Sequence, residues 1–261
     1  MIKSYTLSSR GINGKTHSII SILTTILRTK LGNFDQRSPL IDVFKQHDDE
    51  SPVKLSSTVI ALCKRLIDIG GKATLLFRDY SGHDTVLHHL CRRNIIDMDL
   101  MKKMVRVGGE KLVLATCQEH ATALHYICDG HANIKAVKLL TSVGGKKLVL
   151  MPDEYGRTAL HCACSYLDKK DFKLEVALHL IQLGGEKLVK KIDCSGFTVL
   201  HDTVFKPVVD LELFNRLIEV GRRKLVLMKN SLYKQTAYDM ERNKRAPNQY
   251  VLDRLREIGG K

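Results

Sequence analysis

Large aromatic side chains are scarce in this sequence. Phe, Trp and Tyr together make up 6% of the 261 residues, and Trp is absent. Proteins that bind single-stranded nucleic acid stack bases on exposed aromatic rings, so the scarcity counts against a stacking platform. Apolar residues at 44% and charged residues at 27% are typical of a globular chain. This composition excludes wholesale disorder, collagen and a disulfide-dense mini-protein.

The sequence also lacks a long apolar run. The longest strongly apolar stretch, residues 18–27, has ten residues, four of them hydroxylated. A membrane-spanning helix needs about twenty predominantly apolar residues. We therefore expect no membrane span.

Cysteine pairs with metal-binding or redox spacing are missing. The seven cysteines include no C-x-x-C, the spacing of zinc ribbons and thioredoxin-like motifs. An odd number of thiols fits a reducing compartment better than a secreted protein. The sequence therefore predicts an intracellular protein, cytoplasmic or nuclear.

Acidic residues are outnumbered. Lys and Arg total 42 against 28 Asp and Glu, a formal net charge of +14. An excess of this size favours an acidic partner, which could be protein, nucleic acid or anionic lipid. It carries no information about the fold.

What the sequence does contain is an internal repeat. A hydroxyl residue that opens a T-x-L-H-like box recurs at Ser38, Thr85, Thr122, Thr158, Thr198 and Thr236. A glycine recurs in step at Gly70, Gly108, Gly144, Gly184, Gly221 and Gly259. These evenly spaced landmarks divide the chain into about six units.

The sequence pattern of each unit predicts two helices and a connecting loop. In the unit that opens at Thr158, this residue is the expected N-cap of a short first helix. A second helix is expected over 172–183, where Leu174, Leu178 and Ile181 fall on one face. We expect Gly184 to end it in the left-handed conformation. Residues 185–196 are expected to cross to the next unit, with Leu188 and Val189 extended. Small residues on the first helix let units stack closely into a curved solenoid.

The boxes and loops resemble those of the ankyrin-repeat family. The T-P-L-H box is similar to Thr85–His88, Thr122–His125, Thr158–His161 and Thr198–His201, and the D-x-x-G-x-T loop to 153–158 and 193–198. The resemblance covers residues 38–261 and implies an all-α ankyrin-repeat solenoid of about six helix-turn-helix units with finger loops. The loop glycine is replaced by His120 and Lys234, so we expect those turns to be built differently. The last unit has Asp239 in place of the box His.

The resemblance also implies where a partner would bind. The family binds on its concave face, through finger tips and the exposed side of the first helices. The alternative is ordinary surface variation, and the sequence leaves both open. By register the candidate positions are Tyr80, His89, Arg92, Arg93, Glu119, Tyr126, Asp129, Tyr155, Arg157, Tyr166, Phe197, Phe205, Lys206 and Tyr233.

Histidine and cysteine recur together three residues apart, beginning with His88 and Cys91. Such pairs could ligate zinc, but four ligands would have to converge and each helix offers two. The resemblance implies a structural histidine that bonds neighbouring backbone. No nucleophile elbow, P-loop, zinc-protease or dinucleotide motif is present. We expect no catalytic residue, cofactor or metal.

Lysine recurs just after the glycine landmark in four successive units. In a stack of units these residues form a Lys column, which consists of Lys111, Lys147, Lys187 and Lys224. The column could dock an acidic partner. It could equally be a solvated edge, because Glu110 and Glu186 precede two of its members.

Residues 1–34 are basic and contain no acidic residue. That composition resembles an organellar transit segment. The favoured alternative is a capping helix, because Ile19, Leu23 and Ile26 fall on one helical face. We expect two regions, this segment (1–34) and the solenoid (35–261), in a monomer. The predicted function is a non-catalytic module or scaffold that binds an acidic protein. The alternative is binding of nucleic acid or an anionic surface.

Overall fold

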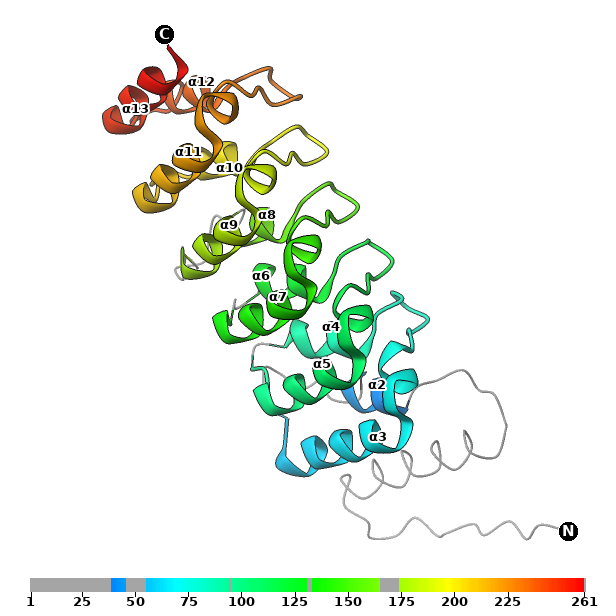
Figure 1. Ribbon diagram of the computed structural model, residues 1–261. Coiled ribbons are helices and arrows are strands. Elements are labelled where there is room, and N and C mark those ends of the chain that lie inside the picture. The colour runs from blue at the N-terminus through cyan, green and yellow to red at the C-terminus, as the bar shows by residue number, and fades with distance from the viewer. Residues whose placement is uncertain (1–38, 46–54, 94, 131–132, 165–173, 261) are drawn as a thin grey trace, which may run out of the picture.

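The computed structural model describes residues 39–45, 55–93, 95–130, 133–164 and 174–260. The expected segment 1–34, Ser38 and Tyr166 lie outside this range. The described residues form twelve helices and no β-strand (Figure 1). The helices are α2 (Pro39–Lys45), α3 (Ser57–Leu76), α4 (Val86–Arg92), α5 (Met98–Val113), α6 (Ala123–Asp129), α7 (Ile134–Val149), α8 (Ala159–Cys164), α9 (Leu174–Val189), α10 (Val199–Phe205), α11 (Leu211–Val226), α12 (Ala237–Arg242) and α13 (Gln249–Gly259).

The helices form two parallel layers in an elongated stack (Figure 1). The short even-numbered helices contact one another in succession and make the inner layer. The longer odd-numbered helices do the same and make the outer layer. Finger loops project from one edge of the stack. Both the all-α solenoid and its six helical pairs are confirmed.

A threonine–histidine pair starts each inner helix of the middle units. The backbone amide of Thr122 donates to His125 Nδ1 at 3.1 Å, and the same bond recurs at Thr85, Thr158 and Thr198. Because Nδ1 accepts, these rings are neutral with the proton on Nε2. His125 Nε2 donates to the carbonyl oxygen of Arg157 in the next unit at 3.2 Å. The structural role predicted for this histidine is therefore confirmed at His125.

Burial keeps the box histidines uncharged. Desolvation lowers the pKa of His88 to about 3 and of His161 to about 4. It also lowers the pKa values of His125 and His201. His201 bridges units as His125 does, since its Nε2 lies 3.3 Å from the Gln235 carbonyl oxygen. All four box histidines thus cap the inner helix of their own unit, and His125 and His201 also bond the backbone of the next unit.

Each outer helix from α3 to α11 contains a kink at the residue after the glycine landmark. Gly185 has φ +59° and ψ −151°, whereas Gly184 stays helical. The prediction that Gly184 adopts the left-handed conformation is wrong by one residue. Position 184 requires glycine because a Cβ there would collide with the side chain of Leu188. The chain then resumes a helical turn, so Leu188 is buried and helical, and the expected extended crossing is wrong as well.

The kink of α11 falls on a residue that is not glycine. Arg222 has φ +53° and ψ −159°, a region that is essentially restricted to glycine. The corresponding residues of the preceding units are Gly71, Gly109, Gly145 and Gly185. Holding a side chain there costs about 1–3 kcal/mol of stability.

Two of the fingers are tight turns held by an aspartate, which is buried at Asp153 and half-buried at Asp193. Asp153 Oδ1 accepts from the amides of Tyr155 and Arg157, and Asp193 Oδ1 accepts from Ser195 and Phe197. Gly156 and Gly196 follow with positive φ. His83, His120 and Lys234 occupy the same place with φ near +56°. The turns at His120 and Lys234 thus keep the positive φ. They differ from the other fingers as expected, because Cys117 and Asn230 replace the aspartate and each of these two fingers carries an antiparallel bridge.

Successive fingers are joined by backbone hydrogen bonds. Gln118 N donates to the carbonyl oxygen of Gly82 at 2.7 Å, and Glu154 N to that of Glu119 at 2.9 Å. Cys194 N donates to Tyr155 O at 2.7 Å, and Ser231 N to Ser195 O at 2.9 Å. We call this series the finger ladder. It fixes the spacing of the tips without using any side chain.

The core runs the length of the stack between the two layers. Buried Leu and Val from every unit fill it, with Phe44 and Phe214 as its largest fully buried side chains. Buried polar residues are distributed unevenly. Among the described residues, Thr141 is the one buried polar residue on an outer helix, and the others lie on fingers and inner helices. No helix in the described ranges has the length and apolar character to cross a bilayer.

Candidate partner-binding surfaces

Three tyrosines stand at the finger tips. Tyr80, Tyr155 and Tyr233 are 65%, 48% and 64% exposed. Each occupies a turn whose backbone is fixed by the finger aspartate or asparagine and by the finger ladder. The structure thus presents predicted site residues as exposed rings on rigid supports.

Arg157 is oriented beside one of these tips. Its Nε donates to Asp153 Oδ2 at 2.9 Å, and its Nη2 lies 2.8 Å from the same oxygen. The guanidinium lies 5.1 Å from the Tyr155 ring centroid. The pair therefore forms an ordered aromatic–cationic surface at the third finger.

A second network brings predicted residues together at the start of the solenoid. Arg92 lies 4.2 Å over the Tyr126 ring and donates to its hydroxyl at 2.6 Å. Its other nitrogen is 2.5 Å from Asp84 Oδ2. The Tyr126 hydroxyl donates to Cys117 Sγ at 3.3 Å. The sequence analysis missed Asp84, although an acid stands there at the position that Arg157 occupies two units later.

His89 lies in this network but not on the surface. It is 4% exposed, and its Nε2 is 3.2 Å from Asp79 Oδ2. The expectation that its side chain is exposed is wrong, because the first finger folds over it. Burial is the main cause that raises the pKa of Asp84, and Arg92 opposes it.

The same network contains donors of metal-binding type. Ligand atoms of Asp79, Asp84 and His89 lie within 4.8 Å of one another. Asp79 Oδ1 accepts from the amides of Gly82 and Asp84, and Asp84 pairs with Arg92. A metal would have to compete with Arg92 for Asp84, so the donors serve the fold.

The remaining predicted residues are scattered. Phe197 is half-buried with its ring 5.7 Å from His201. Phe205 is 58% exposed but lies at the end of α10 away from the finger, next to half-buried Lys206. Arg93 and Asp129 are half-buried at the same end of their inner helices, and Glu119 is exposed on its finger. The structure therefore divides the candidates between the finger edge and the opposite edge.

The Lys column is exposed throughout. Its members follow the kinks, on the last helical turn of each outer helix before the finger. Lys147 lies 4.0 Å from Glu110 of the preceding unit. This exposed contact is a weak ion pair between two neighbouring units.

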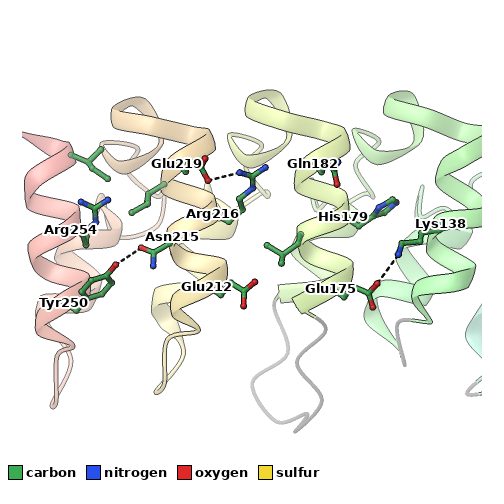
Figure 2. A pocket seen from close by; sticks show the side chains of 13 residues that line it. Lys138, Glu175, His179, Gln182, Glu212, Asn215, Arg216, Glu219, Tyr250 and Arg254 are labelled. Atoms are coloured by element: carbon green, nitrogen blue, oxygen red, sulfur yellow. Dashed lines mark hydrogen bonds and ion pairs between the residues drawn. The ribbon is translucent and has the colours of Figure 1, made fainter.

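A groove that the sequence analysis did not predict crosses the outer layer (Figure 2). It has a volume of about 1140 Å³ and is lined by residues of α7, α9, α11 and α13. Lys138 pairs with Glu175 at 3.0 Å, Arg216 with Glu219 at 2.7 Å, and Tyr250 donates to Asn215 at 3.0 Å.

Charge in this groove is arranged in rows. His179, Arg216 and Arg254 take equivalent places on successive helices, and Glu175 and Glu212 form a neighbouring row. The signal was present in the sequence as recurring outward-facing charges on the second helices. Of the two ion pairs, Lys138–Glu175 joins α7 to α9, whereas Arg216–Glu219 lies within α11.

Comparison with known proteins agrees with the architecture. Residues 87–191 match the family model of ankyrin repeats in three copies. No curated protein matches the chain.

Two solved structures have a similar fold. The ankyrin repeat protein EF0377 superposes with a TM-score of 0.58 at 15% identity, covering 83% of this chain and 94% of that one. The second is a chain from the complex of the predatory endopeptidase Bd0816 of Bdellovibrio bacteriovorus with the immunity protein Bd3460. It has a TM-score of 0.58 at 20% identity, with coverage of 84% and 96%. Residues 87–191 therefore contain ankyrin repeats, and the described chain has the fold of an ankyrin-repeat solenoid, in agreement with the repeat periodicity, the Thr–His boxes and the two stacked helical layers.

Proposed function

We propose that the chain is a non-catalytic docking module whose protein partner binds the finger surface. We define this surface as Tyr80, Tyr126, Tyr155, Tyr233 and the two arginines Arg92 and Arg157. The observation that supports it is the row of exposed tyrosines on fingers that the finger ladder holds in register. Ankyrin repeats generally serve as protein–protein interaction modules.

A surface of this kind can bind a partner with little loss of conformational entropy. Tyr and Arg are the residue types that dominate interface hot spots. Because the tips are already fixed by backbone bonds, binding orders little of the chain and loses little conformational entropy. Affinity then depends on a few aromatic and guanidinium contacts.

A structural neighbour supports the assignment by example. A chain with this fold and nearly full coverage comes from a complex of an endopeptidase with an immunity protein. The fold is therefore compatible with a stable protein–protein assembly. In our chain the excess of positive charge favours an acidic partner and fast, salt-sensitive association.

The alternative function is binding of nucleic acid or an anionic surface. The net charge of +14 and the exposed Lys column support it. It predicts a linear loss of affinity with the logarithm of salt concentration, because phosphate binding releases counterions.

Paired surface variants test the proposal. The finger variant Tyr155→Ser/Tyr233→Ser and the outer-layer control Val143→Ser/Tyr250→Ser each remove exposed apolar area. Each protein, with matched circular dichroism and melting temperature, is used to capture partners from nuclease-treated lysate at moderate salt. We expect specific proteins to bind wild type and the control but not the finger variant. Equal capture by both variants would refute the finger surface.

A further inference from the structure

The turns that follow the kinks form a continuous exposed line, which we call the outer ridge. In each unit its residues lie at the kink of the outer helix or on the helical turn after it, before the finger begins. All of its members are exposed, and one unit contributes three consecutive cations. The ridge consists of Glu110, Lys111, Lys146, Lys147, Glu186, Lys187, Arg222, Arg223 and Lys224.

Arg222 is the unusual member of this ridge. Its backbone has φ +53° and ψ −159°, a conformation that four preceding units assign to glycine. Its side chain is exposed and forms no ion pair or hydrogen bond with any other residue in the described part of the chain. Arg222 contributes only a minor attraction to Glu186 of the preceding unit, so no hydrogen bond or ion pair among the described residues offsets the strain. Backbone strain of this kind is found at functional sites.

The neighbours of Arg222 add to an unbalanced positive charge. Lys224 is exposed and is likewise without an ion pair among the described residues. Arg223 lies against the end of α13, where its guanidinium is next to Gly260 and opposes the helix dipole. Glu186 of the preceding unit hydrogen-bonds Lys190, which is the main cause of its lowered pKa. At this end of the ridge, Glu186 is thus outnumbered by Arg222, Arg223 and Lys224.

We infer that Arg222 and Lys224, continued along the ridge by Lys187 and Lys147, dock an acidic segment of a partner protein. A guanidinium presents paired donors that match a carboxylate, and a lysine adds an adaptable point charge. The backbone strain at Arg222 is offset only when its guanidinium binds a carboxylate of another molecule.

Two features favour an acidic peptide over a nucleic acid on this ridge. No aromatic residue belongs to it, so bases have nothing to stack on. Glu110 and Glu186 stand among its cations and would repel the evenly spaced phosphates of a nucleic-acid strand. The carboxylates of a peptide can be spaced to avoid these acids.

The ridge is separate from the finger surface, so this inference goes beyond the proposed function. A partner could contact both surfaces, but variants on one leave the other unchanged. Failure at the ridge therefore does not affect the case for the finger tyrosines.

The decisive variant is Arg222→Gly, because stability and binding should change in opposite directions. The probe is a fluorescently labelled poly-glutamate peptide, measured by anisotropy with the full chain at low and moderate salt. We expect about fivefold weaker binding, as for loss of one exposed ion pair, together with a higher urea midpoint. Lys224→Gln should weaken binding similarly without raising the midpoint.

Arg245→Ala is the matched control, since it removes one exposed cation from the loop between α12 and α13. We expect its affinity for poly-glutamate to stay close to wild type. An equal loss in this control would show that total charge alone attracts the peptide and would overturn the site. Unchanged binding by Arg222→Gly would do so too. Tighter binding of a single-stranded oligonucleotide than of poly-glutamate, lost in Arg222→Gly, would overturn the assignment to a protein.

Discussion

The inner and outer layers of the solenoid are stabilised by different chemistry. The inner helices and fingers bury threonine, histidine and aspartate side chains that bond one another and the backbone of the next unit. The outer helices bury almost only apolar residues and keep their charges on the surface. The inner layer is therefore specified by hydrogen bonds that need a particular protonation state, whereas the outer layer is specified by packing.

This difference indicates which layer responds to pH and which responds to substitution of packed side chains. An apolar contact is insensitive to pH and tolerates shape-conserving exchange. A buried histidine that accepts a backbone hydrogen bond has no substitute of equal geometry, and its protonation breaks the bond. Four tests, from the largest expected effect to the smallest, can break or sharpen the comparison.

Acidification should act on the inner layer. The box histidines have lowered pKa values in the fold, about 3 for His88 and about 4 for His161, against about 6.5 when unfolded. Below about pH 6.5 the unfolded chain binds protons that the folded chain does not, so stability falls as pH falls. We expect a loss of about 1.4 kcal/mol per histidine for each pH unit, measured by urea unfolding between about pH 7 and 5.

Asp202 gives the opposite sign and serves as the control. Desolvation raises the pKa of its half-buried carboxyl to about 7. Its protonation on acidification therefore stabilises the fold and partly offsets the histidines. Asp202→Asn should lose more stability than wild type over the same pH range. Stability that does not change with pH would contradict the account of the inner layer.

Truncation should act on the outer layer. Phe214 of α11 is fully buried, and Phe214→Ala should cost about 3–5 kcal/mol in urea unfolding through lost apolar contact and a cavity. Phe205→Ala removes the same atoms from a side chain that is 58% exposed, and should change stability by less than about 0.5 kcal/mol. Similar losses in the two variants would mean that α11 does not pack as described.

Substitutions at the box histidine position test how a middle unit differs from the last unit. His125 caps α6 and also bonds Arg157 of the next unit, whereas Asp239 caps α12 through Thr236 and pairs with Arg242 of its own unit. We expect His125→Ala to cost about 2 kcal/mol and Asp239→Ala about 1 kcal/mol in urea unfolding. Equal losses would show that the bond between units contributes nothing.

The kinks give the smallest effect. Gly185 has positive φ, and a Cβ added there would meet no atom within 4 Å. Gly185→Ala should therefore lower stability by about 1 kcal/mol through backbone strain alone. Arg222→Gly should relieve the equivalent strain and raise stability by about 1 kcal/mol. Urea midpoints of both variants measure this, and a midpoint lowered by Arg222→Gly would refute strain at that kink.

The sequence predicted what recurs. The threonine and glycine landmarks were enough to place six helical pairs, the caps at Thr122 and Thr198 and the aspartate-centred fingers, because each needs one residue type at a fixed spacing. The left-handed residue was misplaced by one position. Two adjacent glycines are needed for different reasons, Gly184 for close packing and Gly185 for positive φ, and sequence does not separate these reasons.

The candidate sites were predicted less well. Register indicated which residues share a place in the unit, but not how far a side chain is covered by its neighbours. Tyr155 and His89 were therefore treated alike, although one is exposed and the other is buried against Asp79. The outward-facing charges that line the groove recur in the sequence, but the groove itself depends on the spacing between helices of four units, which no local pattern records.

The finger ladder has a consequence for exchange of residues at the tips. Its hydrogen bonds join main-chain atoms of Gln118, Glu154, Cys194 and Ser231 to the preceding finger, so they do not depend on which side chains those residues carry. New side chains at the exposed tips would be presented in the same geometry as the present ones. The finger edge is thus a natural scaffold for libraries, in which recognition can be redesigned while the frame that displays it is retained.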